Sequence, residues 1–328
     1  MEFMDLTELI FFCYTCTVIS VIAFILGIIS LIIFSHSTFK ESFYKYLRVE
    51  ITLITISLFF SSFRPIHSCY GSPLSQSYIS NNYVKFFLHY LNSPIELTAM
   101  ICHNLYSLYY YLSISEVGQR QPNSFKNKIL KFLKSNCVLF TICIFFINCL
   151  LYLHQVFEFD IVPKDIPGKY YMGKSEFTKC IWFIINQKFA FIFRDFVNLN
   201  LIIVLNIMIC FKLKQYIEQK SKLIEDKQKL EALKRNLHNK LNVILCGSIN
   251  FILGRIPILV YFILDHFYSY DKIHLILKIG VLAVNLSYFL YFILFYFINN
   301  NFRSVFNSHL RGLFLKNKTE NKASTVPS

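Results

Sequence analysis

Apolar residues form seven long blocks along this chain, and polar or charged stretches separate the blocks. A helix needs about 20 predominantly apolar residues to cross the ~30 Å hydrocarbon core of a bilayer. The first block is too long for the core of a signal peptide and has no basic residues before it, so we expect it to be retained. The pattern predicts spans at residues 9–34, 46–62, 84–115, 136–153, 186–211, 241–264 and 273–297.

Composition supports an all-α membrane protein with a single domain. Of the 328 residues, 55% are hydrophobic and only 16% are charged, which is too few to cover a soluble surface of this size. The net charge of +14 could suggest nucleic acid as a partner. We attribute it instead to Lys and Arg retained on the cytoplasmic side of the membrane, and expect the lipid bilayer, not nucleic acid, around this chain.

The distribution of positive charge predicts the orientation of the spans. Loops that share a side with the C-terminus hold 22 Lys and Arg, whereas the opposite loops hold 9. Because cytoplasmic loops carry the excess of Lys and Arg, we expect residues 1–8 to be extracellular. Residues 9–297 then form the transmembrane domain, and residues 298–328 a cytoplasmic amphipathic helix and tail.

The charged stretch at residues 212–240 has no Gly or Pro and predicts helical extensions of the fifth and sixth spans. Apolar residues recur there every seven positions, as in a coiled coil. A dimerising coil would need a second apolar register, which Lys220 and Lys227 do not supply. Solvated helix ends are therefore the favoured interpretation.

The last span ends at three consecutive Asn, residues 299–301, after which apolar residues return at helical spacing with cations between them. This pattern predicts a short amphipathic helix on the inner leaflet, with Phe302 and Phe306 in the acyl boundary. A span followed by Phe-Arg-x-x-Phe resembles the junction of the seventh helix and the juxtamembrane helix in rhodopsin-like (class A) G-protein-coupled receptors.

The sixth span adds to the resemblance, because Phe251 and Pro257 match the spacing of that family's sixth-helix motif. Gly254 and Arg255 stand where the family has Cys and Trp. Of the acidic-Arg-aromatic triplet that ends the family's third helix, only Glu116 fits. The chain is similar in its Phe-rich, motif-poor pattern to divergent invertebrate receptors of the chemosensory or neuropeptide type.

Five ionisable residues stand within the predicted spans, where charge is expensive and commonly functional. We expect them to line an outward-facing cavity that binds a peptide or small chemosensory molecule. The alternative is that Glu96 pairs with Arg194 or Arg255 and holds the bundle together. The candidate ligand-binding residues are Glu96, Arg194, Asp195, Arg255 and Lys278.

Two of the ten cysteines, Cys69 and Cys180, fall in polar loops predicted to be extracellular. An oxidising compartment favours a disulfide between them. In the resembling family, the loop before helix five is tied to helix three instead. Two unpaired loop thiols are the alternative here.

The resemblance implies a plasma-membrane receptor that signals to a heterotrimeric G protein by movement of helix six. Glu116, Asn299 and Arg303 are the candidate contacts on the inner face. No spacing in the sequence indicates a catalytic group, a metal site or a cofactor, so we expect no enzyme. A ligand-gated channel and a transporter are the alternatives, although the charge count and the absence of an internal repeat disfavour them.

Overall fold

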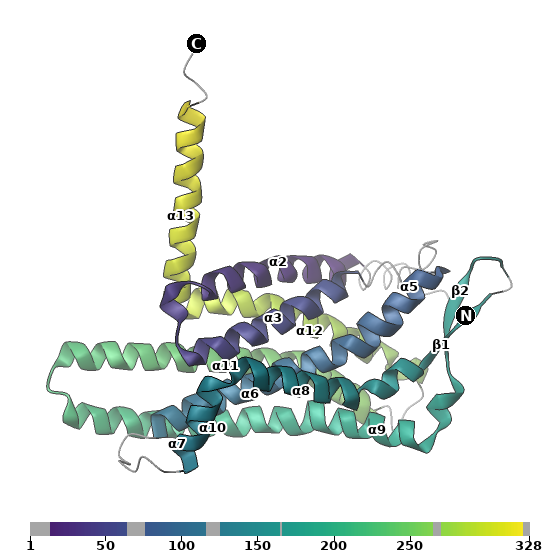
Figure 1. The fold of residues 1–328 in the computed structure, drawn as a ribbon, viewed down its shortest axis with the longest axis horizontal. Coiled ribbons are helices and arrows are strands. Elements are labelled where there is room, and N and C mark those ends of the chain that lie inside the picture. The colour runs from purple at the N-terminus through teal and green to yellow at the C-terminus, as the bar shows by residue number, and fades with distance from the viewer. Residues whose placement is uncertain (1–13, 64–75, 116–124, 165, 265–269, 324–328) are drawn as a thin grey trace.

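The computed structural model describes residues 14–63, 76–115, 125–164, 166–264 and 270–323. These residues are mostly helical, with one antiparallel hairpin of two strands, β1 (Phe159–Pro163) and β2 (Tyr170–Lys174). The long helices lie side by side in a bundle (Figure 1). They are α2 (Cys16–Phe34), α3 (Ser42–Ser62), α6 (Asn92–Ser115), α8 (Cys137–Leu151), α10 (Asn198–Leu223), α11 (Lys227–Leu264) and α12 (Tyr270–Ile298).

Shorter elements join or extend these helices. Two of them have π-helical hydrogen bonding: η4 (Val84–Leu91), which leads directly into α6, and η7 (Ile192–Val197), which joins α9 (Ile181–Phe191) to α10. The others are α5 (Tyr78–Tyr83), α7 (Phe125–Ser135), α13 (Asn300–Ala323) and the short η2 (Ser37–Phe39), η5 (Leu153–Phe157) and η6 (Glu176–Lys179).

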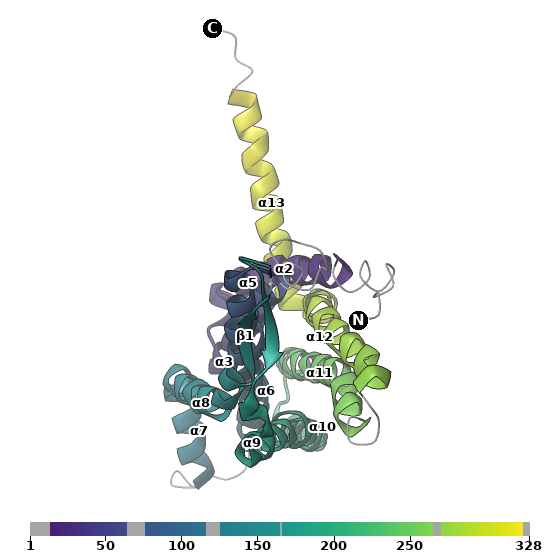
Figure 2. The same cartoon turned by 90° about the vertical axis from the view of Figure 1, so that its right-hand side faces the viewer.

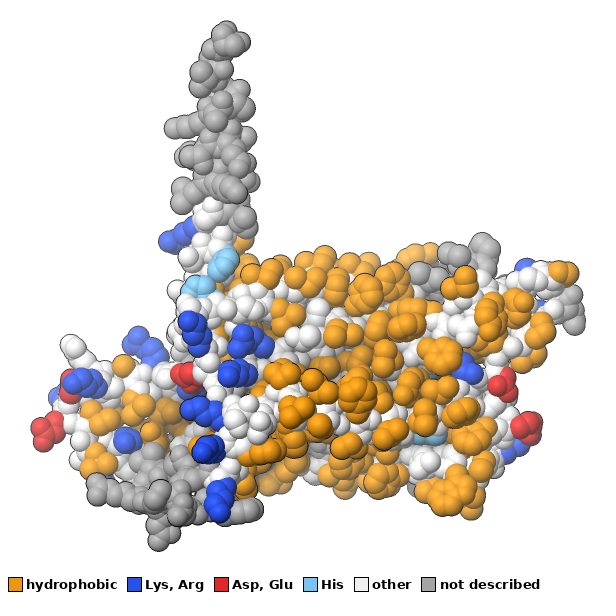
Figure 3. Space-filling model, viewed as in Figure 1, with side chains coloured by type: hydrophobic (Ala, Val, Ile, Leu, Met, Phe, Trp, Pro, Cys, Tyr) orange, Lys and Arg blue, Asp and Glu red, His pale blue; other side chains and the backbone are white. Residues whose placement is uncertain are grey.

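Five helices of the described residues are long and apolar enough to cross a membrane. They are Cys16–Phe34, Cys137–Phe157, Ile181–Leu223, Lys227–Leu264 and Ile279–Ile298. On the face shown in Figure 3, a broad apolar belt covers the middle of the bundle, and charged side chains collect at its two ends. A multi-pass membrane protein has this distribution, because lipid tails contact the belt and water contacts the ends.

Helices α3 and α6 are not among the five, and their position explains why. Both are central helices: α6 contacts α3, α8, α10 and α11, and most of its residues are buried. A central helix faces other helices more than lipid, so it can carry polar side chains that bond across the bundle. Glu50 in α3 and His103 in α6 are such residues, and neither is exposed at all.

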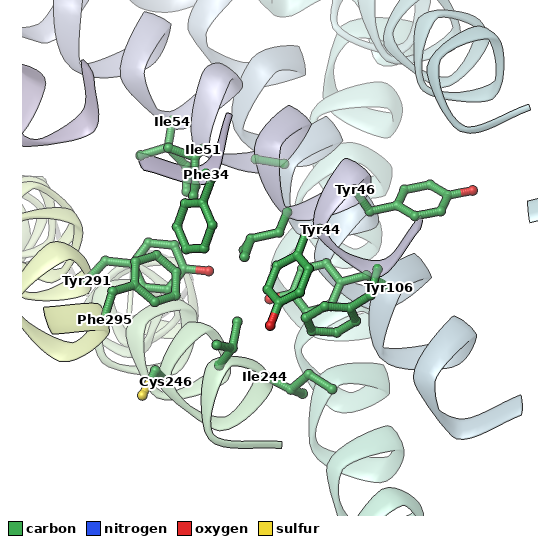
Figure 4. Packing of buried hydrophobic residues seen from close by; sticks show 14 of the residues in the cluster. Phe34, Tyr44, Tyr46, Ile51, Ile54, Tyr106, Ile244, Cys246, Tyr291 and Phe295 are labelled. Atoms are coloured by element: carbon green, nitrogen blue, oxygen red, sulfur yellow. The ribbon is translucent and has the colours of Figure 1, made fainter. Parts of the chain in front are cut away.

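The core of the bundle is aromatic. Phe34 of α2, Tyr44 and Tyr46 of α3, and Phe295 of α12 are buried in one cluster (Figure 4). Phe34 packs edge-on against Phe295, with ring centroids 5.2 Å apart. Aromatic pairs of this kind contribute about 0.5–1.5 kcal/mol beyond the area that they bury.

The charged stretch of residues 212–240 is helical, as the sequence predicts. α10 continues to Leu223 and α11 begins at Lys227, so the two helices extend beyond the bundle as a pair (Figure 1). Asp226 caps the second helix, because its Oδ1 accepts hydrogen bonds from the backbone N–H of Gln228 and Lys229.

The last helix, α13, leaves the bundle at a steep angle to α12 (Figures 1 and 2). It has 24 residues, so the expectation of a short helix is wrong. Phe302 also differs from expectation: it is fully buried and packs on Phe34 and Phe295 instead of reaching the lipid. Phe306 packs on Phe292 and Tyr296 of α12.

Two loops contain structure that the sequence did not predict. The basic stretch after α6 includes α7, and the polar stretch before α9 includes the β1–β2 hairpin. In that hairpin Asp160 pairs with Gly173 and Pro163 with Tyr170. Gly168 lies between the strands with a φ of +79°, a conformation that favours glycine.

Candidate functional site

Three of the ionisable residues predicted from the spans meet inside the bundle. Arg255 of α11 donates from Nη2 to Glu96 Oε2 of α6 at 2.6 Å, and its Nη1 lies 3.6 Å from Asp195 Oδ1. The Arg255 side chain is 2% exposed and the Asp195 side chain 0%. The alternative in which Glu96 pairs with Arg255 therefore describes this structure.

Arg194 completes the network from the same π-helical segment as Asp195. Its Nε donates to Asp195 Oδ2 at 2.8 Å, and its Nη2 lies 2.6 Å from the same oxygen. The four side chains carry two positive and two negative charges. This balance matters because a buried charge without a partner is very costly, whereas a paired and hydrogen-bonded one is tolerated.

The remaining carboxylate oxygen of Glu96 is also bonded. Its Oε1 accepts from Asn92 Nδ2 at 3.0 Å and from Ser57 Oγ at 3.4 Å. Asn92 is the first residue after the π-helical segment η4. The network, which we call the ion-pair layer (Glu96, Arg194, Asp195, Arg255), thus joins α3, α6, η7 and α11.

A second buried cluster lies closer to the end of the bundle where α10 and α11 extend. We call it the Glu50 layer, after the carboxylate at its centre. Tyr291 Oη of α12 donates to Glu50 Oε1 at 2.9 Å, and His103 Nδ1 lies 3.6 Å from that oxygen. His103 Nε2 pairs with Ser248 Oγ at 2.8 Å, and Tyr106 Oη bonds to His103 Nδ1.

The two layers repeat along three helices at one spacing. Seven residues make about two helical turns, a rise of about 10.5 Å, so residues seven apart lie on the same side of a helix. Because α6 runs antiparallel to α3 and α11, each layer contains one residue from each of the three helices, and the next layer contains the residue seven positions away on each helix. The pairs are Ser57 and Glu50 on α3, Glu96 and His103 on α6, and Arg255 and Ser248 on α11.

Sequence reasoning missed Glu50 as a site residue, although it lies inside the predicted span 46–62. The sequence could have indicated it, because Glu50, like Glu96, is an acidic residue within a predicted span, where charge is rare and commonly functional. His103 likewise joins two helices, because it makes a hydrogen bond with Ser248 of α11.

The predicted inner-face residues are placed differently from one another. Asn299 is 1% exposed, and its Oδ1 accepts from the backbone N–H of Phe302, so it caps α13 and offers no side-chain surface to a partner. Arg303 is exposed and donates to Asn300 Oδ1 at 2.7 Å. Glu116 lies outside the described residues.

Two further predicted positions also lie outside the described part of the chain: the side chain of Lys278, and Cys69. Cys180, the other half of the expected disulfide, is a free thiol at the start of α9. The expected Cys69–Cys180 disulfide is therefore absent from this structure.

The chemistry available in both layers is the exchange of hydrogen-bond and ion-pair partners. Among the described residues, no three His, Cys, Asp or Glu side chains group as metal ligands would.

Comparison with known proteins finds no family model that matches the chain and no matching curated protein.

Proposed function

We propose that this chain is a seven-span receptor of the plasma membrane that binds an extracellular ligand and signals to a G protein. In addition to the five apolar spans, we count α3 and the η4–α6 unit as spans. α3 has 21 residues and α6 has 24, which correspond to about 31 and 36 Å of helix. Both run alongside the other helices of the bundle (Figures 1 and 2).

The observation that carries the proposal is the ion pair between Glu96 and Arg255, which joins two long helices through side chains that are 12% and 2% exposed. A ligand with charges of both signs, such as a peptide or an amino-acid derivative, could replace one partner of each residue. Such a ligand would bind best to an arrangement in which α6 and α11 have separated, and so it would shift the population toward that arrangement.

Pro257 gives α11 a place to bend. It lies inside the helix, two residues from Arg255, and its missing N–H and its ring weaken the helical hydrogen bonding of the preceding turn. A change at Arg255 would therefore act close to a weak point in α11. The part of α11 that precedes Pro257 includes the long extension that begins at Lys227.

The proposed G-protein surface is the end of the bundle that bears this extension and α13. Basic side chains gather there in Figure 3, on the side that the charge count assigns to the cytoplasm. Arg303 remains a candidate contact because it is exposed there. The buried Asn299 contributes instead by capping the helix that carries Arg303.

The experiment is nucleotide exchange on a panel of purified G proteins, with the full chain in vesicles and no ligand added. Glu96→Gln removes the carboxylate that holds Arg255, so we expect higher basal exchange than with the wild-type chain. Glu176→Gln removes a charge from an exposed residue of η6 and is the matched control. No exchange by either the wild-type chain or Glu96→Gln, on any G protein, would reject the signalling function.

A transporter is the second candidate, and the π-helical segments η4 and η7 favour it. Transporters often bind their substrates at interrupted helices near the middle of the membrane, and the Arg194–Asp195 pair lies on η7. Uptake of labelled amino acids into vesicles that contain the chain distinguishes the two. Uptake abolished by Glu96→Gln, without nucleotide exchange, would favour the transporter.

A further inference from the structure

A groove opens on the outer surface of the bundle between α10 and α11, near the end where both helices extend. It has a volume of about 580 Å³. Five of its lining residues come from one side of α10 and one comes from α11: Asn206, Ile207, Cys210, Phe211, Lys214 and Leu245. The buried side of α10 is different, and includes Ile202, Leu205, Ile209 and Leu213.

The groove faces the surroundings of the protein instead of its core. Ile207 is 52% exposed and Phe211 is 69% exposed. In a membrane-spanning bundle, apolar side chains with this exposure contact lipid tails. Its volume is in the range of small-molecule sites, about 300–1,000 Å³, and a lining of six residues is too small to seat a second helix about 10–12 Å across.

The groove is apolar over most of its length and has a positive charge at one end. Ile207, Cys210 and Phe211 make its apolar part, and the exposed Lys214 stands at its rim, within the Lys-rich start of the α10 extension. Lys214 Cα lies seven residues, or about 10.5 Å of helix, beyond that of Ile207. An apolar trough that ends at a cation matches a molecule with a hydrocarbon chain and an anionic head.

We propose that this groove is a binding site for one anionic phospholipid of the inner leaflet. An acyl chain lies along Ile207, Phe211 and Leu245, and the phosphate is held by the Lys214 ammonium. This site differs from the general attraction between basic loops and an anionic surface, because it requires both the apolar trough and the cation at its rim. It does not depend on the proposed signalling function.

The test is native mass spectrometry of the purified full chain with dioleoylphosphatidylserine or dioleoylphosphatidylcholine. We expect the wild-type chain to retain one phosphatidylserine in preference to phosphatidylcholine. Lys214→Gln should weaken that retention roughly fivefold, the effect of losing one favourable charge near an anionic headgroup. Lys222→Gln makes the same change eight residues further along α10, outside the groove, and should leave retention unchanged.

A second variant tests the apolar part separately. Ile207→Trp fills the trough with a lipid-facing side chain and leaves every charge in place, so it should also reduce phosphatidylserine retention. Equal losses in Lys214→Gln and Lys222→Gln would show only a general surface attraction and overturn the proposal. Unchanged retention in Ile207→Trp, or equal retention of the two lipids by the wild-type chain, would overturn it as well.

Discussion

Arg255 Nη2 lies 2.6 Å from Glu96 Oε2, and this ion pair joins α11 to α6 across 159 positions of sequence. Both partners have further bonds: Glu96 accepts from Asn92 and Ser57, and Arg255 approaches Asp195. Both oxygens of the Glu96 carboxylate therefore have partners from neighbouring side chains. The ion pair therefore fixes one specific contact between α6 and α11.

Removing one member of this pair should destabilise the bundle strongly. Glu96→Gln leaves the Arg255 guanidinium buried with only the more distant Asp195 as an acidic neighbour. Breaking a buried pair in this way costs about 3–5 kcal/mol in soluble proteins. We expect a clear loss of thermal stability in detergent, measured by the exposure of buried thiols during heating.

The double variant Glu96→Gln with Arg255→Gln provides the control for this prediction. It removes both charges and leaves two uncharged amides, so it should be more stable than Glu96→Gln alone. The contrary result would be a double variant whose loss of stability equals the sum of the losses in Glu96→Gln and Arg255→Gln. The two side chains would then not be coupled, and the ion pair could not hold α6 and α11 together.

The hydroxyl of Tyr291 should contribute measurably to stability. Tyr291→Phe removes the donor at 2.9 Å from Glu50 Oε1, an oxygen that also lies 3.6 Å from His103 Nδ1. We expect a loss of about 1–3 kcal/mol in unfolding free energy, the usual cost of an unsatisfied buried polar group.

Tyr296→Phe is the matched control, five residues further along α12, because the Tyr296 ring packs on Phe306 in a less buried position. Denaturation in mixed micelles measures the unfolding free energy of both variants. Equal stability of the two would mean that the Glu50 layer contributes nothing to the fold.

The absence of a side chain at position 247 is a requirement of the Glu50 layer. A Cβ placed on Gly247 would lie 2.5 Å from His103 Cε1 and 2.9 Å from Tyr106 Oη. The imidazole cannot yield cheaply, because Ser248 and Tyr106 hold it on both nitrogens. Gly247→Ala should therefore cost about 1–3 kcal/mol, as overpacking of a core does.

Gly312→Ala tests whether this cost is local, because nothing lies within 4 Å of the added Cβ in α13. There the higher helix propensity of Ala should leave stability unchanged or slightly higher. Thermal shift measurements on both variants check the pair of expectations. A tolerated Gly247→Ala would contradict the described packing around His103.

The hydrophobic pattern predicted the helices well because the number of apolar residues needed to cross a membrane is a strong physical constraint. It could not show that Glu50 and Glu96 face inward in two layers, since this depends on how α3, α6 and α11 pack. Phe302 is similar: its helical position could be predicted, but its burial against Phe34 depends on the path that α13 takes from α12.

Predictions from local sequence were also wrong where contacts with distant parts of the chain determine the structure. The loop location of Cys180 favoured a disulfide, yet its thiol is free in the structure. Five of the eleven residues of α7 are apolar, but four lysines lie among them, so the stretch resembled a basic loop. In α11, by contrast, the positions of Arg255 and Pro257 were enough to mark the region where the ion-pair layer forms.

The most direct test of this account is the location of the two ends of the chain. Epitope tags at Met1 and Ser328 would be labelled with antibodies on intact and on permeabilised cells. Seven spans with the positive loops inside predict that the N-terminal tag is labelled on intact cells and the C-terminal tag only after permeabilisation. Labelling of both tags on intact cells, or of neither tag until the cells are permeabilised, would place both ends on one side of the membrane and contradict the receptor topology.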